Sequence, residues 1–123
     1  MKILIVDDSR AMRSIVSRML RQAGFGGHTF QEASNGAEAL KAIREARPDL
    51  VLADFNMPEM DGMQLLNSIK TEGLATKFGF ITSEASAELR TAAAAAGAIF
   101  VITKPFTPET FQLMVSHALS GDS

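Results

Sequence analysis

The chain has 123 residues, no cysteine and a formal net charge of −2 at pH 7. Its hydrophobic content of 46% is too high for a disordered protein, and no apolar run reaches the roughly 20 residues that cross a bilayer. The lack of cysteine excludes disulfides and thiolate metal sites. The slightly acidic charge does not provide the basic surface that binds nucleic acid. We therefore expect one domain over 1–123, without a membrane segment and without direct nucleic-acid binding.

The chain enters an apolar strand directly after Met1, which leaves no room for a signal peptide. Together with the absence of cysteine, this start predicts a cytoplasmic protein.

Five strand-like segments alternate with five segments of helical periodicity. The expected strands are Ile3–Val6, Thr29–Ala33, Leu50–Ala53, Phe78–Ile81 and Ile99–Ile102. Four of these strands are continuous apolar runs, which is typical of buried parallel strands. The segment Thr29–Ala33 is polar and is expected at an edge of the sheet.

The first two helices have clear stop signals. In the first helix, apolar residues recur at helical spacing before a stop at Gly24; they are Met12, Ile15, Val16, Met19, Leu20 and Ala23. The turn Asn35-Gly36 opens the second helix, which turns Leu40 and Ile43 inward and ends before Pro48.

The other three helices follow the third, fourth and fifth strands. The third helix carries Met63, Leu65, Leu66 and Ile69. A fourth is expected over about Ala85–Ala96 and ends at Gly97; it stacks Leu89, Ala92, Ala93 and Ala96 on one face. Its outer side, with Thr91, Ala94 and Ala95, is uncharged. The last opens with Thr107 as N-cap and Pro108 in the first turn, and buries Phe111, Met114, Val115 and Ala118.

Strict alternation of strands and helices predicts a parallel sheet with right-handed crossovers and helices on both faces. The fold class is therefore α/β, and we expect a flavodoxin-like (βα)5 doubly wound parallel sheet with strand order 2-1-3-4-5. That order is borrowed from the known flavodoxin-like class, and it suits this chain because it leaves the polar second strand at the edge.

Polar side chains stand where four of the strands end. Asp7 and Asp8 follow the first strand, Asp54 the third, Thr82 the fourth and Lys104 the fifth. Ligands of open α/β sheets bind beyond the carboxyl ends of the strands, so we expect these side chains to form one site. Crowded carboxylates repel one another unless a cation compensates them. Hard oxygen ligands suit Mg²⁺.

A carboxylate beside such a metal can attack a phosphoryl group and form an aspartyl phosphate. The transferred group carries negative charge, which the metal, the Lys104 ammonium and the Thr82 hydroxyl would stabilise. The pattern therefore predicts a phosphorylatable carboxylate with its stabilising groups around it.

Four segments, in their order and spacing, resemble the receiver domains of two-component response regulators, and in particular stand-alone CheY-like regulators. They are Val6-Asp7-Asp8-Ser9-Arg10, Asp54-Phe55-Asn56-Met57-Pro58-Glu59-Met60-Asp61-Gly62, Thr82-Ser83 and Lys104-Pro105-Phe106. The resemblance covers essentially the whole chain. Each segment alone is a weak signal, whereas the four together are specific.

The resemblance implies a role for each site residue. Asp54 would be the phosphoacceptor, Lys104 would pair with the phosphoryl oxygens, and Thr82 would move to bond them after phosphorylation. The implied ligands of Mg²⁺ are Asp7, Asp8, Asp54 and the main-chain carbonyl of Asn56. Pro105 would follow a cis peptide bond that aims Lys104 into the site.

Three further positions follow from the same resemblance. Asn56 and Glu84 would tune the rate of dephosphorylation. Val101 stands three residues before Lys104, where many receivers carry the aromatic residue that moves with the threonine. Phe100 is adjacent, but one step along a strand points to the opposite face. The usual aromatic switch is therefore expected to be missing or substituted.

The implied function is a phosphorylation-activated switch that takes its phosphoryl group from a histidine kinase. The fourth helix, fifth strand and fifth helix would present the changed surface to a downstream protein, as in chemotaxis regulators. Such a protein is a signalling domain rather than an enzyme, since it catalyses only its own phosphorylation and dephosphorylation, and we expect a monomer.

Three alternatives stay open on the sequence. The chain could be a receiver taken from a larger regulator with a DNA-binding or enzymatic output, or a receiver-like interaction module that is never phosphorylated. A Mg²⁺-dependent phosphohydrolase is the third, although the haloacid-dehalogenase enzymes use an Asp-x-Asp on the first strand, which Asp7-Asp8-Ser9 is not.

Overall fold

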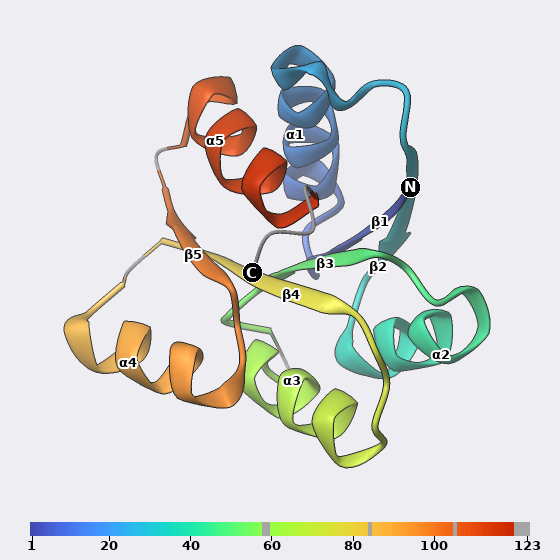
Figure 1. Ribbon diagram of the computed structural model, residues 1–123, viewed down its shortest axis with the longest axis vertical. Coiled ribbons are helices and arrows are strands. Elements are labelled where there is room, and N and C mark those ends of the chain that lie inside the picture. The colour runs from blue at the N-terminus through green and yellow to red at the C-terminus, as the bar shows by residue number, and fades with distance from the viewer. Residues whose placement is uncertain (58–59, 84, 105, 120–123) are drawn as a thin grey trace.

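A five-stranded parallel sheet forms the middle layer of the molecule in the computed structural model (Figure 1). The structure describes residues 1–57, 60–83, 85–104 and 106–119. The strands are β1 (Lys2–Val6), β2 (Thr29–Ala33), β3 (Leu50–Asp54), β4 (Lys77–Thr82) and β5 (Phe100–Thr103). Their order is β2-β1-β3-β4-β5 and every neighbouring pair is parallel. The predicted flavodoxin-like fold is confirmed, with the polar strand β2 at one edge.

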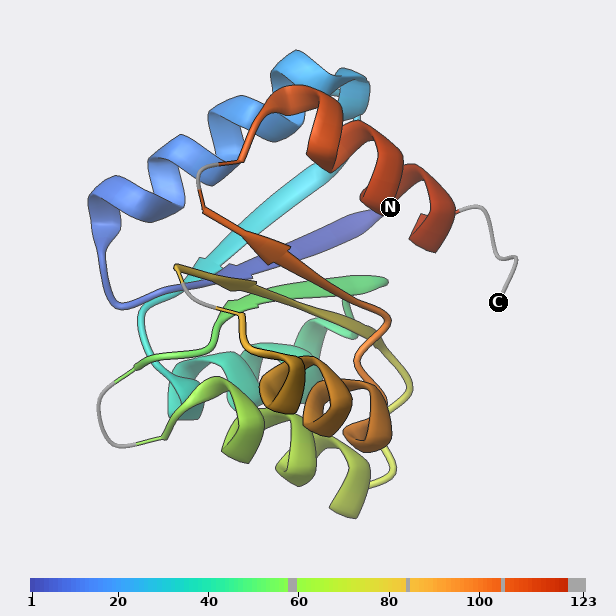
Figure 2. The ribbon, with the colours of Figure 1, turned by 90° about the vertical axis from the view of Figure 1, so that its left-hand side faces the viewer.

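Helices cover both faces of this sheet. They are α1 (Arg10–Leu20), α2 (Gly36–Ala46), α3 (Gly62–Thr71), α4 (Ala87–Ala96) and α5 (Pro108–Leu119); a short turn η1 (Arg21–Phe25), interrupted by the left-handed backbone of Gly24, follows α1. Figure 2 shows α1 and α5 on one face and α2, α3 and α4 on the other. Each face has its own apolar cluster, because successive strand residues point to opposite sides. In the described part of the chain, no helix is long and apolar enough to span a membrane.

The predicted helix ends are largely confirmed. Gly24 and Gly97 both adopt a backbone φ of 104°, a left-handed conformation that interrupts a helix and that glycine adopts without strain. The side chain of Thr107 accepts a hydrogen bond from the N–H of Thr110 (3.3 Å), as an N-cap does. The fourth helix begins at Ala87 rather than near Ala85, because Ser86 caps it by accepting from the N–H of Leu89 (3.1 Å).

Two of the predicted inward positions are wrong. Ile15 is 38% exposed, and Ala92 is exposed as well. The face of α1 that meets the sheet and α5 is centred on Val16 and Leu20, which are buried, and Ile15 lies outside it. In α4 only Ala93 is buried, because this helix packs against the rim of the sheet beside the edge strand β5.

Candidate functional site

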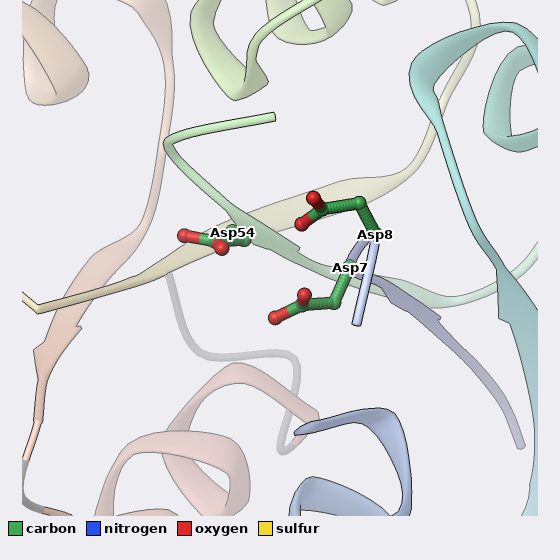
Figure 3. Close-up of side chains that lie close together, drawn as sticks. All are labelled: Asp7, Asp8 and Asp54. Atoms are coloured by element: carbon green, nitrogen blue, oxygen red, sulfur yellow. The ribbon is translucent and has the colours of Figure 1, made fainter. Parts of the chain in front are cut away.

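The strand pairing brings the first-strand acids and Asp54 to the same edge of the sheet. Val6 of β1 is paired with Ala53 of β3, so the next residues, Asp7 and Asp54, lie at the same level along the two strands. One carboxylate oxygen from each of Asp7, Asp8 and Asp54 lies within 4.8 Å of the other two. Figure 3 shows the three carboxylates close together at the ends of the two strands. The predicted convergence of the acids is confirmed.

The three acids differ in their contact with water. Asp7 is buried, with 5% of its surface exposed, whereas Asp54 is half-buried and Asp8 is exposed. The cluster is therefore closed beneath Asp7 and open to solvent beside Asp8. Oxygen ligands at this spacing, with room for water on one side, are the donor set that a small hard cation such as Mg²⁺ uses.

Main-chain groups hold the acids in place. The N–H of Ser9 donates to Asp7 Oδ1 (2.8 Å), and the N–H of Asn56 donates to Asp54 Oδ1 (3.3 Å). The guanidinium of Arg13 donates to the carbonyl of Asp7 (2.7 Å). No pattern in the sequence pointed to Arg13, whose only distinction is its place one helical turn after Ser9, from which it reaches back to the end of β1.

Burial and crowding both disfavour the charged forms of these acids. Burial raises the pKa of Asp7 to about 6, and the charges of Asp54 and Asp8 act in the same direction. The Ser9 hydrogen bond and the Lys104 charge oppose that rise in the pKa. Burial also raises the pKa of Asp54, against the hydrogen bond from Asn56 and the charge of Lys104. The site therefore favours a bound cation, which would stabilise the charged carboxylates.

Thr82 and Lys104 reach the same edge from β4 and the end of β5. Thr82 is fully buried and is paired with Thr103, directly before Lys104. The N–H of Lys104 donates to the carbonyl of Thr82 (2.9 Å). Because Lys104 acts on the pKa of both Asp7 and Asp54, its cationic side chain lies within electrostatic reach of the acid cluster.

Val101 and its neighbour Phe100 pack on different sides of β5. Val101 is partly buried and packs in the cluster under α2, α3 and α4, whereas Phe100 belongs to the cluster under α1 and α5. The two residues thus face opposite sides of the sheet, as the strand geometry predicted. Phe100 lies over Gly79, and it does not occupy the face on which Thr82 and Val101 lie.

Gly62 has a second role that the sequence did not reveal. It is the first residue of α3, whose start is held by the capping box of Asp61 and Gln64. A Cβ atom at Gly62 would also lie 2.7 Å from the carbonyl oxygen of Asp54. The lack of a side chain at Gly62 therefore lets α3 start directly against the strand end that carries the central acid.

Some of the predicted positions lie outside the described residues. They are Glu84 and Pro105, together with Pro58 and Glu59 of the longest matched segment. Asn56 is described: it is exposed beside the acids, and its N–H bonds Asp54.

Comparison with known proteins gives a family match over most of the chain. The family model described as the response regulator receiver domain matches residues 3–116. Chemotaxis protein CheY-3 of Vibrio cholerae is 42% identical over 114 residues, which cover 91% of this chain and 86% of that protein. Regulatory protein AtoC of Escherichia coli is 36% identical over 99% of this chain but only 26% of its own length.

A solved structure has the same fold over nearly its whole length. It is the chemotaxis protein CheY4 of Vibrio cholerae, which is 34% identical and superposes with a TM-score of 0.84. The match covers 95% of this chain and 97% of that one.

Proposed function

Because the chain belongs to the response regulator receiver domain family, and therefore serves phosphorylation-dependent signalling in a two-component system, we propose that its phosphoacceptor is Asp54. The observation that carries this proposal is the cluster of three carboxylates with oxygens within 4.8 Å. Asp54 is the half-buried member, so its oxygen is accessible to a phosphodonor while burial and a main-chain hydrogen bond orient it.

The acids fit Mg²⁺ because they offer hard oxygen donors at short spacing beside open solvent. We assign the ion to Asp7, Asp8, Asp54 and the main-chain carbonyl of Asn56. When bound, Mg²⁺ supplies positive charge to the oxygens of the phosphoryl group. Asp54 attacks the phosphorus atom, and the leaving group of the donor departs with the bonding electron pair. The Lys104 ammonium then pairs with the phosphoryl oxygens.

The conformational response would start at Thr82, whose side chain lies on the face of the sheet covered by α3 and α4. After phosphorylation its hydroxyl would bond a phosphoryl oxygen, and α4, β5 and α5 would present a changed surface. Val101 fills the place of the usual aromatic partner on β5, so the coupling of Thr82 to this surface would rely on packing of an aliphatic side chain. Asn56 and Glu84 would tune the rate of dephosphorylation.

The partners follow from the family and its relatives. We propose a histidine kinase as phosphodonor and a protein target for the face formed by α4, β5 and α5. A chemotaxis or motility pathway is supported by the similarity to CheY-3. The proposal includes a single receiver domain over 1–123 that catalyses only its own phosphorylation and dephosphorylation. It also includes a monomeric state and a cytoplasmic location.

Similarity to AtoC favours a second candidate, in which this receiver serves a larger regulator. The chain matches 26% of AtoC, so receivers of this kind also occur within longer proteins. The chemistry of Asp54 would be the same in both cases.

The test is phosphorylation of the chain by acetyl phosphate with Mg²⁺, followed by mass spectrometry. We expect one phosphoryl adduct that survives acid and is lost in base. Asp54→Asn should not form it, while its far-ultraviolet circular dichroism stays unchanged because the replacement is nearly isosteric.

Asp49→Asn is the matched control. Asp49 lies before β3, at the other end of the strand, and the variant should be phosphorylated like the wild type. An adduct in Asp54→Asn would move the phosphoacceptor elsewhere, and no adduct in the wild type would favour a silent interaction module.

A further inference from the structure

A polar hollow lies between α1 and the edge strand β2, on the side of the sheet that α1 covers. Its volume is about 330 Å³, and its lining residues are Ser14, Ser17, Arg18, Arg21 and Glu32. Ser17, Arg18 and Arg21 lie three, four and seven residues after Ser14, so these four residues share one face of the helix. None of them belongs to the acid cluster, and the receiver function described above does not use them.

Arg21 is held in place by two contacts. Its guanidinium donates to the hydroxyl oxygen of Ser17 (2.8 Å) and lies over the ring of Phe30, 5.1 Å from the ring centre. Ser17 is itself buried, with 8% of its surface exposed. A guanidinium has five N–H donors, and this hydrogen bond uses one of them. Although Arg21 is exposed, these contacts position its guanidinium, whose other N–H groups make no hydrogen bond to the part of the chain that the structure describes.

The charges around the hollow favour an anion. Its one carboxylate, on Glu32, is already paired with the guanidinium of Arg13 at 2.8 Å. Among the described residues, neither Arg18 nor Arg21 forms an ion pair. Two positive charges, together with the hydroxyl groups of Ser14 and Ser17, thus face a space whose described lining offers no unpaired carboxylate.

We propose that this hollow binds a small phosphate monoester. A phosphate group carries close to two negative charges at neutral pH and offers three acceptor oxygens, which matches two arginines and the flanking hydroxyls. Arginine suits phosphate because its planar fork of donors can bond two oxygens at once. The volume is at the lower end of the range for ligand sites, which suits a phosphate with a small organic group.

The test uses the full chain with a chelator present, so that no divalent ion can bridge phosphate to the acid cluster. Inorganic phosphate and glycerol 3-phosphate are titrated separately, and amide and arginine Nε–H signals are followed by NMR. Saturable shifts are expected along Ser14–Arg21 with both compounds. If glycerol 3-phosphate binds more tightly than inorganic phosphate, the hollow also contacts the organic group. If the two compounds bind equally, the hollow recognises the phosphate group alone.

Arg18→Gln and Arg21→Gln should each weaken binding by about tenfold or more, because each loses a charge-assisted hydrogen bond. Arg18 is exposed, so its variant should fold even if Arg21→Gln loses stability with its contact to Phe30. Arg90→Gln, in an exposed arginine of α4, is the control and should bind like the wild type.

Shifts that rise linearly without saturation, or equal weakening in Arg90→Gln, would overturn the proposal. A hexaglutamate peptide is the third arm of the titration. If it saturates the same signals at lower concentration than either phosphate compound, the hollow is a contact for an acidic protein segment and not a phosphate site.

Discussion

Asp7 shows how one residue connects the stability of this protein with its chemistry. The residue is buried, with 5% of its surface exposed, and its carboxyl group lies beside two other acids. Burying a charge without compensation is costly, and this cost raises its pKa to about 6. The metal-free protein therefore carries a local instability that a bound cation would relieve.

This instability predicts an unusual pH dependence for the metal-free protein. The pKa of Asp7 is about 6 in the folded chain and 3.8 in its ordinary state, so the folded state holds the proton more tightly. This proton binding contributes fully to the free energy of unfolding below the lower pKa, and its contribution is lost as the pH rises through the higher pKa. We expect Asp7→Asn, which carries no charge, to gain stability relative to the wild type between about pH 4 and about pH 7, by up to about 3 kcal/mol.

Urea unfolding in a chelator, followed by circular dichroism because the chain lacks tryptophan and tyrosine, measures this difference. The exposed carboxylates of Glu38 and Glu72, which have lowered pKa values, affect both proteins equally and cancel. A constant stability difference across this pH range would show that Asp7 is not desolvated in the folded chain.

At the scale of elements, the contact between β4 and β5 depends on the missing side chain at Gly79. The ring of Phe100 lies so close that a Cβ atom at Gly79 would fall 2.1 Å from one of its carbons. The two residues share the face covered by α1 and α5. The ring thus packs over the neighbouring strand, in space that the side chain of a larger residue at position 79 would occupy.

Gly79→Ala should therefore destabilise the protein by about 1–3 kcal/mol, as overpacking of a core does. The double variant with Phe100→Leu should lose less free energy of unfolding than the sum of the two single variants, since the smaller side chain leaves room for the new methyl group. Urea unfolding of the four proteins in this cycle measures the coupling. Additive effects would mean that the ring and the glycine do not constrain each other.

The start of α3 depends on a reciprocal cap. Asp61 accepts from the N–H of Gln64 (2.9 Å), and the Gln64 side chain accepts from the N–H of Asp61 (2.9 Å). Asp61→Ala should lower the free energy of unfolding by about 1 kcal/mol. Asp61→Asn keeps a capping oxygen, so its free energy of unfolding should stay within a few tenths of a kcal/mol of the wild-type value. An equal loss of stability in both variants would point to the charge of Asp61 instead.

At the scale of the whole molecule, metal binding and folding are linked through the acid cluster. A ligand that binds only the folded state stabilises it, by about 2.7 kcal/mol at a hundredfold excess over its dissociation constant. We expect Mg²⁺ to raise the unfolding midpoint of the wild type. Asp8→Ala should remove this effect, because it deletes a proposed ligand that is exposed and carries little of the fold.

Glu45→Ala is the matched control, since Glu45 is an exposed acid on α2. Thermal unfolding with increasing Mg²⁺ should give parallel curves for this variant and the wild type. A full Mg²⁺ response in Asp8→Ala would place the ion outside the cluster of Asp7, Asp8 and Asp54.

The sequence alone determined the order of the elements, the polar edge strand and the residues that meet at the carboxyl edge. These features could be predicted because they depend on local patterns: continuous apolar runs for buried strands, helical spacing of apolar residues, and polar residues directly after strands. Parallel strands place such residues at one edge whatever the details of packing. The motif segments then specified the family.

Only the tertiary structure decided how deeply each group is buried and what it contacts. The difference between buried Asp7 and exposed Asp8, the exposure of Ile15, the fit of Phe100 over Gly79 and the hollow beside Arg21 depend on contacts between distant segments. Periodicity shows which face of an element is apolar, but the extent to which that face is covered depends on the neighbouring elements. The pKa of each acid depends on the same coverage, because burial is its largest cause.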